Sequence, residues 1–151
     1  IKDDWIKTTL KSFVGIFGYQ NIIMSNKIYE FYLLLWLVGI IGCIFNLKKL
    51  FVYDKKEKNK YILNYIFIPS IIIPIILSIY YSYTSDYQAQ GRYIIGIIIP
   101  FTYFIVSGIK TILEKFIKSE KIRNIIIILI MVIIILIAQR ALFGYIIPTY
   151  K

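Results

Sequence analysis

Arginines that adjoin apolar runs are the residues of this chain whose type suggests ligand chemistry. Arg92 lies in the segment Gln90-Gly91-Arg92-Tyr93, which separates a polar stretch from a long apolar run. Arg140 follows a glutamine near the end of the last apolar run. A guanidinium presents a planar fork of donors that suits phosphate or carboxylate groups. Arg92 and Arg140, with Gln90 and Tyr93 beside the first arginine, are therefore predicted to bind a phosphate.

Other interpretations of these arginines stay open at this point. Ionisable side chains at the edge of a membrane span also extend to lipid headgroups or pair with acids. Asp86 is the one acid in the polar stretch before Gln90, and Glu30 lies near the start of another apolar run. Asp86 is a candidate ion-pair partner of Arg92 or a candidate base. Because the sequence holds no paired-carboxylate motif and no glycine-rich phosphate loop, its catalytic residues stay unknown.

Metal and disulfide chemistry find few ligands in this sequence. The chain contains no histidine, and Cys43 is its one cysteine. Zinc, haem and Ser-His chemistry therefore lack their usual ligands and bases, and no disulfide can form within the chain. No cofactor and no metal site are predicted here, and a divalent metal would have to be held by residues upstream of Ile1.

Long apolar runs define the fold class. The chain is 59% hydrophobic, and the fourteen residues from Ile125 to Ala138 include no polar side chain. Helices in soluble cores seldom reach this length without a polar face. The sequence predicts an all-α membrane protein with about four transmembrane helices, near 28–47, 61–81, 91–113 and 122–143. We expect Pro69 and Pro74 to bend the second span and residues after 143 to leave the membrane.

The distribution of basic residues predicts how the chain crosses the membrane. The net charge is +10, and eleven of the eighteen basic residues fall in loops 48–60 and 110–123. Basic loops that alternate with basic-poor ones are typical of the cytoplasmic side. Both loops are therefore predicted to be cytoplasmic in a multi-pass protein of the bacterial cytoplasmic (inner) membrane. Membrane lipid is the expected partner, and nucleic acid is excluded because no nucleic-acid-binding module accompanies the lysines.

The first part of the chain differs from the spans. Residues 1–26 mix charged and apolar side chains, and glycines alternate with aromatic residues near its middle. This pattern predicts an extracytoplasmic amphipathic or re-entrant segment, followed by a four-span region at 27–151. The chain starts with Ile1 and shows no signal-peptide pattern, so we interpret it as the C-terminal part of a larger polytopic protein.

Two short motifs resemble the signatures of a known family. The first is Ser12-Phe13-Val14-Gly15-Ile16-Phe17-Gly18-Tyr19, and the second is Gln90-Gly91-Arg92-Tyr93 at an outer span mouth. In sequence, order and separation they resemble two signatures of DUF2142, a family of bacterial multi-pass membrane proteins. The motif residues carried over are Ser12, Phe13, Gly15, Phe17, Gly18 and Tyr19. Val14 and Tyr19 stand where that family tends to have tryptophan, and Gly96 stands where it often has proline.

The resemblance implies a function. The family is similar to the GT-C-type glycosyltransferases, which take sugars from polyprenyl-phosphate carriers on the extracytoplasmic side. It implies the C-terminal membrane region of a bacterial cell-envelope glycosyltransferase-like protein, with a polyprenyl-phosphate-linked sugar as partner. The acidic motif of such transferases would lie before Ile1, so the resemblance leaves open whether the whole protein is an enzyme. A lipid-carrier flippase or transporter and a non-catalytic membrane assembly subunit are the alternatives.

Overall fold

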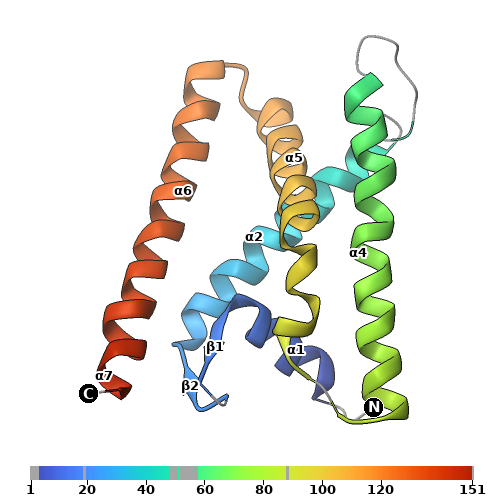
Figure 1. The fold of residues 1–151 in the computed structure, drawn as a ribbon. Helices are drawn as coiled ribbons and strands as arrows, with labels where there is room; N and C mark the ends of the chain where they lie inside the picture. The colour runs from blue at the N-terminus through green and yellow to red at the C-terminus, as the bar shows by residue number, and fades with distance from the viewer. Residues whose placement is uncertain (1–3, 19, 48–50, 52–57, 88, 151) are drawn as a thin grey trace.

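The computed structural model describes residues 4–18, 20–47, 51, 58–87 and 89–150, and most of them are helical (Figure 1). Helix α1 (Trp5–Gly15) leads into a hairpin of β1 (Ile16–Phe17) and β2 (Ile22–Ile23), and α2 (Asn26–Phe45) and α4 (Lys58–Thr84) follow. The 3-10 helix η2 (Gly91–Ile97) continues into α5 (Ile98–Phe116). Helix α6 (Glu120–Ala141) continues through the π turn η3 (Leu142–Ile146) into α7 (Ile147–Thr149).

The four predicted spans are confirmed as helices. Four segments are long and apolar enough to cross a membrane: Asn26–Phe45, Tyr61–Thr84, Gly91–Phe116 and Glu120–Thr149. In Figure 1, α1, the hairpin and α7 lie at one end of the bundle, and the α5–α6 turn lies at the other. A helix satisfies its own backbone hydrogen bonds, so it is the form in which a single segment crosses lipid. The protein is thus an all-α, multi-pass membrane protein.

Helices α2 and α5 form the closest contact between two spans. A β-carbon on Gly42 would overlap the Gly108 carbonyl group, and one on Gly108 would overlap the Gly39 carbonyl oxygen. Small residues let helix backbones approach in this way. The Cys43 thiol donates to the Phe104 carbonyl oxygen at 2.9 Å. Glycine spacing thus fixes where α2 crosses α5.

Helix α4 runs without interruption through Pro69 and Pro74. Figure 1 shows no sharp kink along it, and the bend expected from the two prolines stays a prediction. In the turn between them, the Ser70 hydroxyl donates to the Ile66 carbonyl oxygen at 2.8 Å.

The last span extends beyond its predicted end. We expected the chain to leave the membrane after 143, but helical structure continues to Thr149. Gly144 lies within the π turn, where one extra residue is accommodated without ending the helix. The Thr149 hydroxyl donates to the Tyr145 carbonyl oxygen at 2.7 Å. A glycine therefore does not end this helix, because the backbone beyond it stays hydrogen-bonded.

A small core joins the N-terminal segment to the spans. Met24, Ile28, Tyr29 and Ala141 are buried together, which links the hairpin, α2 and α6. The Tyr29 hydroxyl donates to the Gly15 carbonyl oxygen at 2.9 Å and accepts from the Met24 amide at 3.1 Å. The segment before α2 is thus a folded helix and hairpin rather than another continuous span.

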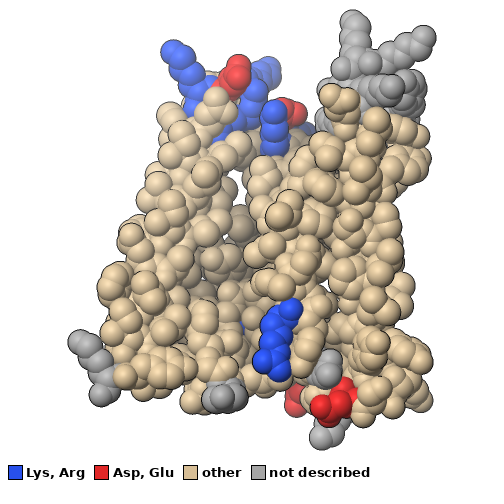
Figure 2. Space-filling view, in the orientation of Figure 1, with Lys and Arg blue, Asp and Glu red and all other residues tan. Residues whose placement is uncertain are grey.

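Charge is concentrated at the ends of the bundle. Figure 2 shows a largely tan surface along the helices and basic side chains gathered over the α5–α6 turn. Residues 110–123 form part of that end of the molecule, opposite α1. Most of loop 48–60 lies outside the described residues. The fold therefore has the charge pattern of a membrane protein.

Candidate anion site at the α1–η2 contact

The two motifs found in the sequence meet in space. Gly91 is buried, and a β-carbon on it would overlap the backbone of Ser12 and Phe13. Only glycine fits at this position, because a β-carbon would meet backbone atoms, which cannot rotate away as a side chain can. Gly91 thus brings the start of η2 directly against α1.

The 3-10 geometry of η2 sorts its residues onto different faces. Gly91, Ile94 and Ile97 recur every three residues and are buried. In a 3-10 helix, residues three apart eclipse one another. Arg92 and Ile95 accordingly share another face, which faces a small cleft.

This cleft, which we call the Arg92 cleft, has a volume of about 210 Å³. Its lining comes from α1, the hairpin and the start of η2, and consists of Ser12, Ile16, Gly18, Gln20, Gln90, Gly91, Arg92 and Ile95. Side-chain hydroxyl, amide and guanidinium groups are all present in this set, and all of them are hydrogen-bond donors. The arrangement can bind an anion, although it offers no carboxylate that could act as a base.

Glycine residues shape the hairpin side of the cleft. Gly15 has φ of +154° and Gly18 has φ of +62°, values that residues with side chains rarely adopt. Gln20 also has a positive φ of 65° and lines the cleft. The glycines of the first motif thus serve the hairpin geometry, and Phe17 packs against the small core. Tyr19, the last residue of that motif, lies outside the described residues.

Arg92 is exposed and not buried among the helices. Its Nη2 atom donates to the Tyr93 hydroxyl at 3.0 Å, and its Cζ atom lies 5.0 Å from the centre of the Tyr93 ring. The guanidinium therefore lies at the surface and is not turned inward among the helices. A cation over the face of an aromatic ring is stabilised while it stays accessible to water. Tyr93 thus positions Arg92 at the surface of the cleft.

The acids considered as partners do not neutralise Arg92. Asp86 and Glu30 are exposed, and neither forms an ion pair with Arg92 within the described ranges. Arg140 is exposed in the last turn of α6 and is not among the residues that line the Arg92 cleft. The structure therefore brings together Gln90, Arg92, Tyr93 and the first motif, and it leaves Arg140 and Asp86 outside.

Two contacts that hold α1 in place were not expected from the sequence. The Trp5 indole nitrogen donates to the Ser82 hydroxyl on α4 at 2.9 Å. The Phe13 ring lies 5.9 Å from the Trp36 ring and 6.0 Å from the Phe101 ring, measured between centroids. A tryptophan near a membrane surface is usually interpreted as an anchor in the lipid interface. The sequence alone therefore did not indicate that Trp5 bonds to α4.

Among the described residues, no group of three His, Cys, Asp or Glu side chains lies close enough to hold a metal ion. The fold is that of a multi-pass α-helical membrane protein, and the small cleft beside Arg92, which pairs with no acid in the described part of the chain, is its candidate anion site. No family model, no curated protein and no solved structure matches the chain.

Proposed function

We propose that the Arg92 cleft binds the phosphate of a lipid-linked sugar. In this proposal the chain is the C-terminal membrane region of a glycosyltransferase-like protein of the bacterial cell envelope. The observation that carries it is the meeting of the two motifs around Arg92, which forms no ion pair with an acid among the described residues. Its contact with Tyr93 leaves the charge of Arg92 available to an anionic ligand.

The donors around the cleft suit a phosphate group. A guanidinium has five N–H donors, and the hydrogen bond to Tyr93 uses one nitrogen of Arg92. Ser12 on α1 and Gln90 at the start of η2 add a hydroxyl and an amide. At roughly 30 Å³ per water molecule, the cleft has room for about seven waters, enough for a phosphate that keeps part of its hydration. The site thus suits a phosphate that stays partly in water.

The surroundings suit a phosphate attached to lipid. Tyr80, Tyr81 and Tyr83 are exposed at the end of α4, next in the chain to the loop that leads into η2. Tyrosines of this kind favour the boundary between hydrocarbon and water. A phosphate bound at Arg92 would lie at the same depth as the headgroups, so a lipid carrier would not have to leave the bilayer.

The side of the membrane follows from the charge pattern. The Arg92 cleft lies at the end of the bundle opposite the basic α5–α6 turn. Because basic loops favour the cytoplasmic side, the cleft is proposed to face the extracytoplasmic side of the inner membrane. Sugars on polyprenyl-phosphate carriers are used on that side.

In a transfer reaction, Arg92 would stabilise the negative charge that develops on the departing phosphate. The base that activates the acceptor would come from outside the cleft, because the described lining contains no carboxylate. The exposure of Arg92 and this lack of a carboxylate favour a second candidate, a non-catalytic assembly subunit that binds the lipid carrier. For a flippase, no described contact gives specific support.

The test is binding of a polyprenyl phosphate to the full-length protein. Arg92→Gln removes the charge, and Arg140→Gln is the matched control because Arg140 is an exposed arginine outside the cleft. A hydrogen bond to a charged group contributes roughly 1.5–3 kcal/mol, so Arg92→Gln should weaken binding about tenfold or more. Unchanged binding in Arg92→Gln would refute the site. Loss of glycan assembly in cells that carry Arg92→Gln would favour the transferase over the assembly subunit.

A further inference from the structure

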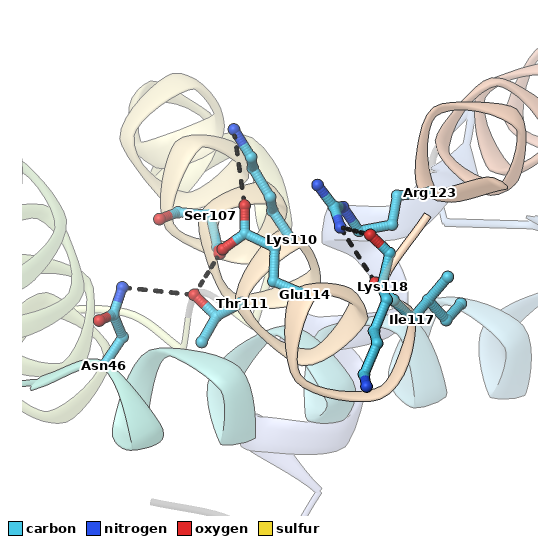
Figure 3. A network of polar contacts seen from close by, with 8 residues as sticks. All are labelled: Asn46, Ser107, Lys110, Thr111, Glu114, Ile117, Lys118 and Arg123. Atoms are coloured by element: carbon cyan, nitrogen blue, oxygen red, sulfur yellow. Dashed lines mark hydrogen bonds and ion pairs between the residues drawn. The ribbon is translucent and has the colours of Figure 1, made fainter. Parts of the chain in front are cut away.

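Charged side chains at the two ends of the bundle differ in how they are paired. At the α5–α6 turn, Lys110 pairs with Glu114 at 4.0 Å. The Arg123 Nη1 atom there donates to the carbonyl oxygens of Ile117 at 3.0 Å and Lys118 at 3.1 Å (Figure 3). At the opposite end, two lysines and a glutamate line one pocket between α1 and α2 and form no ion pair among the described residues.

This pocket, which we call the α1–α2 pocket, has a volume of about 350 Å³. Residues spaced three or four apart line it, and such residues lie on the same side of a helix. They include Lys7, Leu10 and Lys11 on α1 and Asn26, Glu30 and Leu33 on α2. The other side of α1 is buried, since Trp5 and Thr9 are 7% and 3% exposed. One face of α1 therefore packs in the protein, and the opposite face lines the pocket.

The α1–α2 pocket extends from the membrane surface into the hydrocarbon. The span in α2 begins at Asn26, at the end of the bundle where α1 lies (Figure 1). At 1.5 Å per residue, Glu30 lies about 6 Å and Trp36, which also lines the pocket, about 15 Å along the helix from Asn26. The hydrocarbon core is about 30 Å thick, so Trp36 lies well inside it. An occupant along the whole pocket must therefore be polar at one end and apolar at the other.

The apolar part of the pocket is accessible from the bilayer. Leu10 and Leu33 line it and are 39% and 47% exposed. Apolar side chains that are exposed at this depth contact the acyl chains of lipids. A membrane lipid can thus enter the pocket without leaving the bilayer.

Lys11 is held in position at the polar end. Its Nζ atom donates to the Asn26 Oδ1 atom at 3.2 Å and lies 5.2 Å from the centre of the Tyr29 ring. An ammonium group has three N–H donors, so the bond to Asn26 leaves two of them for a ligand. Lys7 lies one helical turn away on the same side of α1 and adds a second positive charge.

Glu30 places a negative charge in the same pocket. It is exposed and lies one turn of α2 from Asn26, the residue that holds Lys11. Like charges placed together at a binding surface cost binding free energy. The carboxylate would therefore disfavour a purely anionic ligand, and the two lysines would disfavour a purely cationic one. A ligand that carries both signs of charge suits the pocket better than either.

We propose that the α1–α2 pocket binds a phospholipid of the phosphatidylethanolamine class. Its phosphate accepts hydrogen bonds from Lys7 and Lys11, and its primary ammonium group donates to Glu30. One acyl chain lies along Leu33 and Trp36. No residue of this pocket lines the Arg92 cleft, so the proposal does not depend on the function proposed there.

The test measures lipid binding to the full-length protein in detergent micelles by native mass spectrometry. Phosphatidylethanolamine, phosphatidylglycerol and phosphatidylcholine with identical acyl chains are titrated separately. Phosphatidylglycerol has no amine, and the choline nitrogen has no N–H donor. We expect phosphatidylethanolamine to bind about tenfold more tightly than either, the size of one hydrogen bond between charged groups. Equal binding of the three lipids, or tightest binding of phosphatidylglycerol, would overturn the proposal.

Glu30→Gln tests the site of the ammonium group. The variant should lose the preference of about tenfold for phosphatidylethanolamine over phosphatidylglycerol, because the amine no longer meets a charged acceptor. Asp86→Asn is the matched control, since Asp86 is an exposed acid outside the pocket. A Glu30→Gln protein that keeps the preference would show that the carboxylate does not bind the amine.

Lys7→Gln with Lys11→Gln tests the site of the phosphate. Each lysine near a headgroup contributes about fivefold in binding, so the double variant should bind phosphatidylethanolamine about tenfold or more weakly. Lys27→Gln, next to Asn26 but outside the lining, should bind it as the unmodified protein does. If the double variant does not fold, Lys7→Gln alone should weaken binding about fivefold, because Lys7 is exposed. Unchanged binding in the folded variant would refute the phosphate site.

The acyl chain is tested with the headgroup alone. Glycerophosphoethanolamine has the same phosphate and amine but no chains, so it should displace the lipid only at a concentration at least about tenfold higher. Displacement at the concentration of the lipid itself would mean that the apolar part of the pocket contributes nothing, and it would exclude a lipid as the specific ligand.

Discussion

Two contacts of this protein differ in how closely their elements approach: the α1–η2 contact and the α5–α6 contact. At the first, Gly91 is packed against backbone atoms of Ser12 and Phe13. At the second, isoleucines such as Ile105 and Ile130 face each other across a groove of about 480 Å³. A missing side chain lets backbones meet at the first contact, whereas the isoleucines of α5 and α6 leave a groove between the two helices at the second.

The difference follows from what drives association in a membrane. Lipid tails are as apolar as isoleucine, so apolar helices gain little by leaving lipid for one another. Close contacts then depend on small residues and hydrogen bonds, as at Gly91 and between Trp5 and Ser82. Mutations should therefore cost most where backbones meet and least along the groove.

Gly91→Val should have the largest effect. Its side chain would overlap the backbone of α1, so η2 and α1 must separate, at a cost of about 3 kcal/mol or more. Thermal unfolding in detergent micelles measures this loss. Gly96→Val is the matched control, because nothing lies within 4 Å of a β-carbon there. Equal melting temperatures for the two variants would contradict the close α1–η2 contact.

Gly108→Ala tests the corresponding contact between two spans. The added methyl group would overlap the Gly39 carbonyl oxygen and come within 2.9 Å of the Cys43 amide nitrogen. Separation of α2 from α5 should cost about 1–3 kcal/mol and make the Cys43 thiol react faster with maleimide. A β-carbon on Gly144 would lie 3.8 Å from its nearest neighbour. Gly144→Ala should therefore leave the stability and the Cys43 reactivity near those of the unmodified protein.

Trp5→Phe should have a smaller effect, because it removes one hydrogen bond and keeps an aromatic ring. The lost bond to the Ser82 hydroxyl is expected to cost about 1 kcal/mol. Ser82→Ala removes the same bond from the other side, so the double variant should be little less stable than either single one. Additive losses in this cycle would show that the two side chains do not interact.

The positions of the spans could be predicted from the sequence, because a bilayer demands about twenty apolar residues per crossing. The end of the last span could not be predicted. A glycine such as Gly144 commonly marks the end of a helix, but the backbone around it keeps its hydrogen bonds through a π turn. In lipid the need to satisfy the backbone outweighs the low helix propensity of one glycine.

The candidate site could be predicted only in part. The two sequence motifs each identified residues that line the Arg92 cleft. The sequence did not indicate that Gly91 packs on Ser12 and so brings the two motifs together. The orientation of Arg92 depends on its neighbour Tyr93. Arg140 lies apart because its side chain is exposed, although the next residue, Ala141, is buried in the small core. An isoleucine run has the same pattern whether it faces lipid or a groove. The groove between α5 and α6 could therefore not be predicted from the sequence.

Ile130→Phe should have the smallest effect, because it tests the loosely packed α5–α6 contact. A larger apolar side chain normally strains a packed core by about 1–3 kcal/mol. The groove beside Ile130 has room for the extra atoms. We therefore expect the stability to change by no more than about 0.5 kcal/mol, less than a larger side chain costs in a packed core. The measurement is thermal unfolding in detergent beside Ile105→Phe, whose parent side chain is 5% exposed and touches Gly39. A large loss in Ile130→Phe, equal to that in Ile105→Phe, would mean that α5 and α6 pack as tightly as α2 and α5.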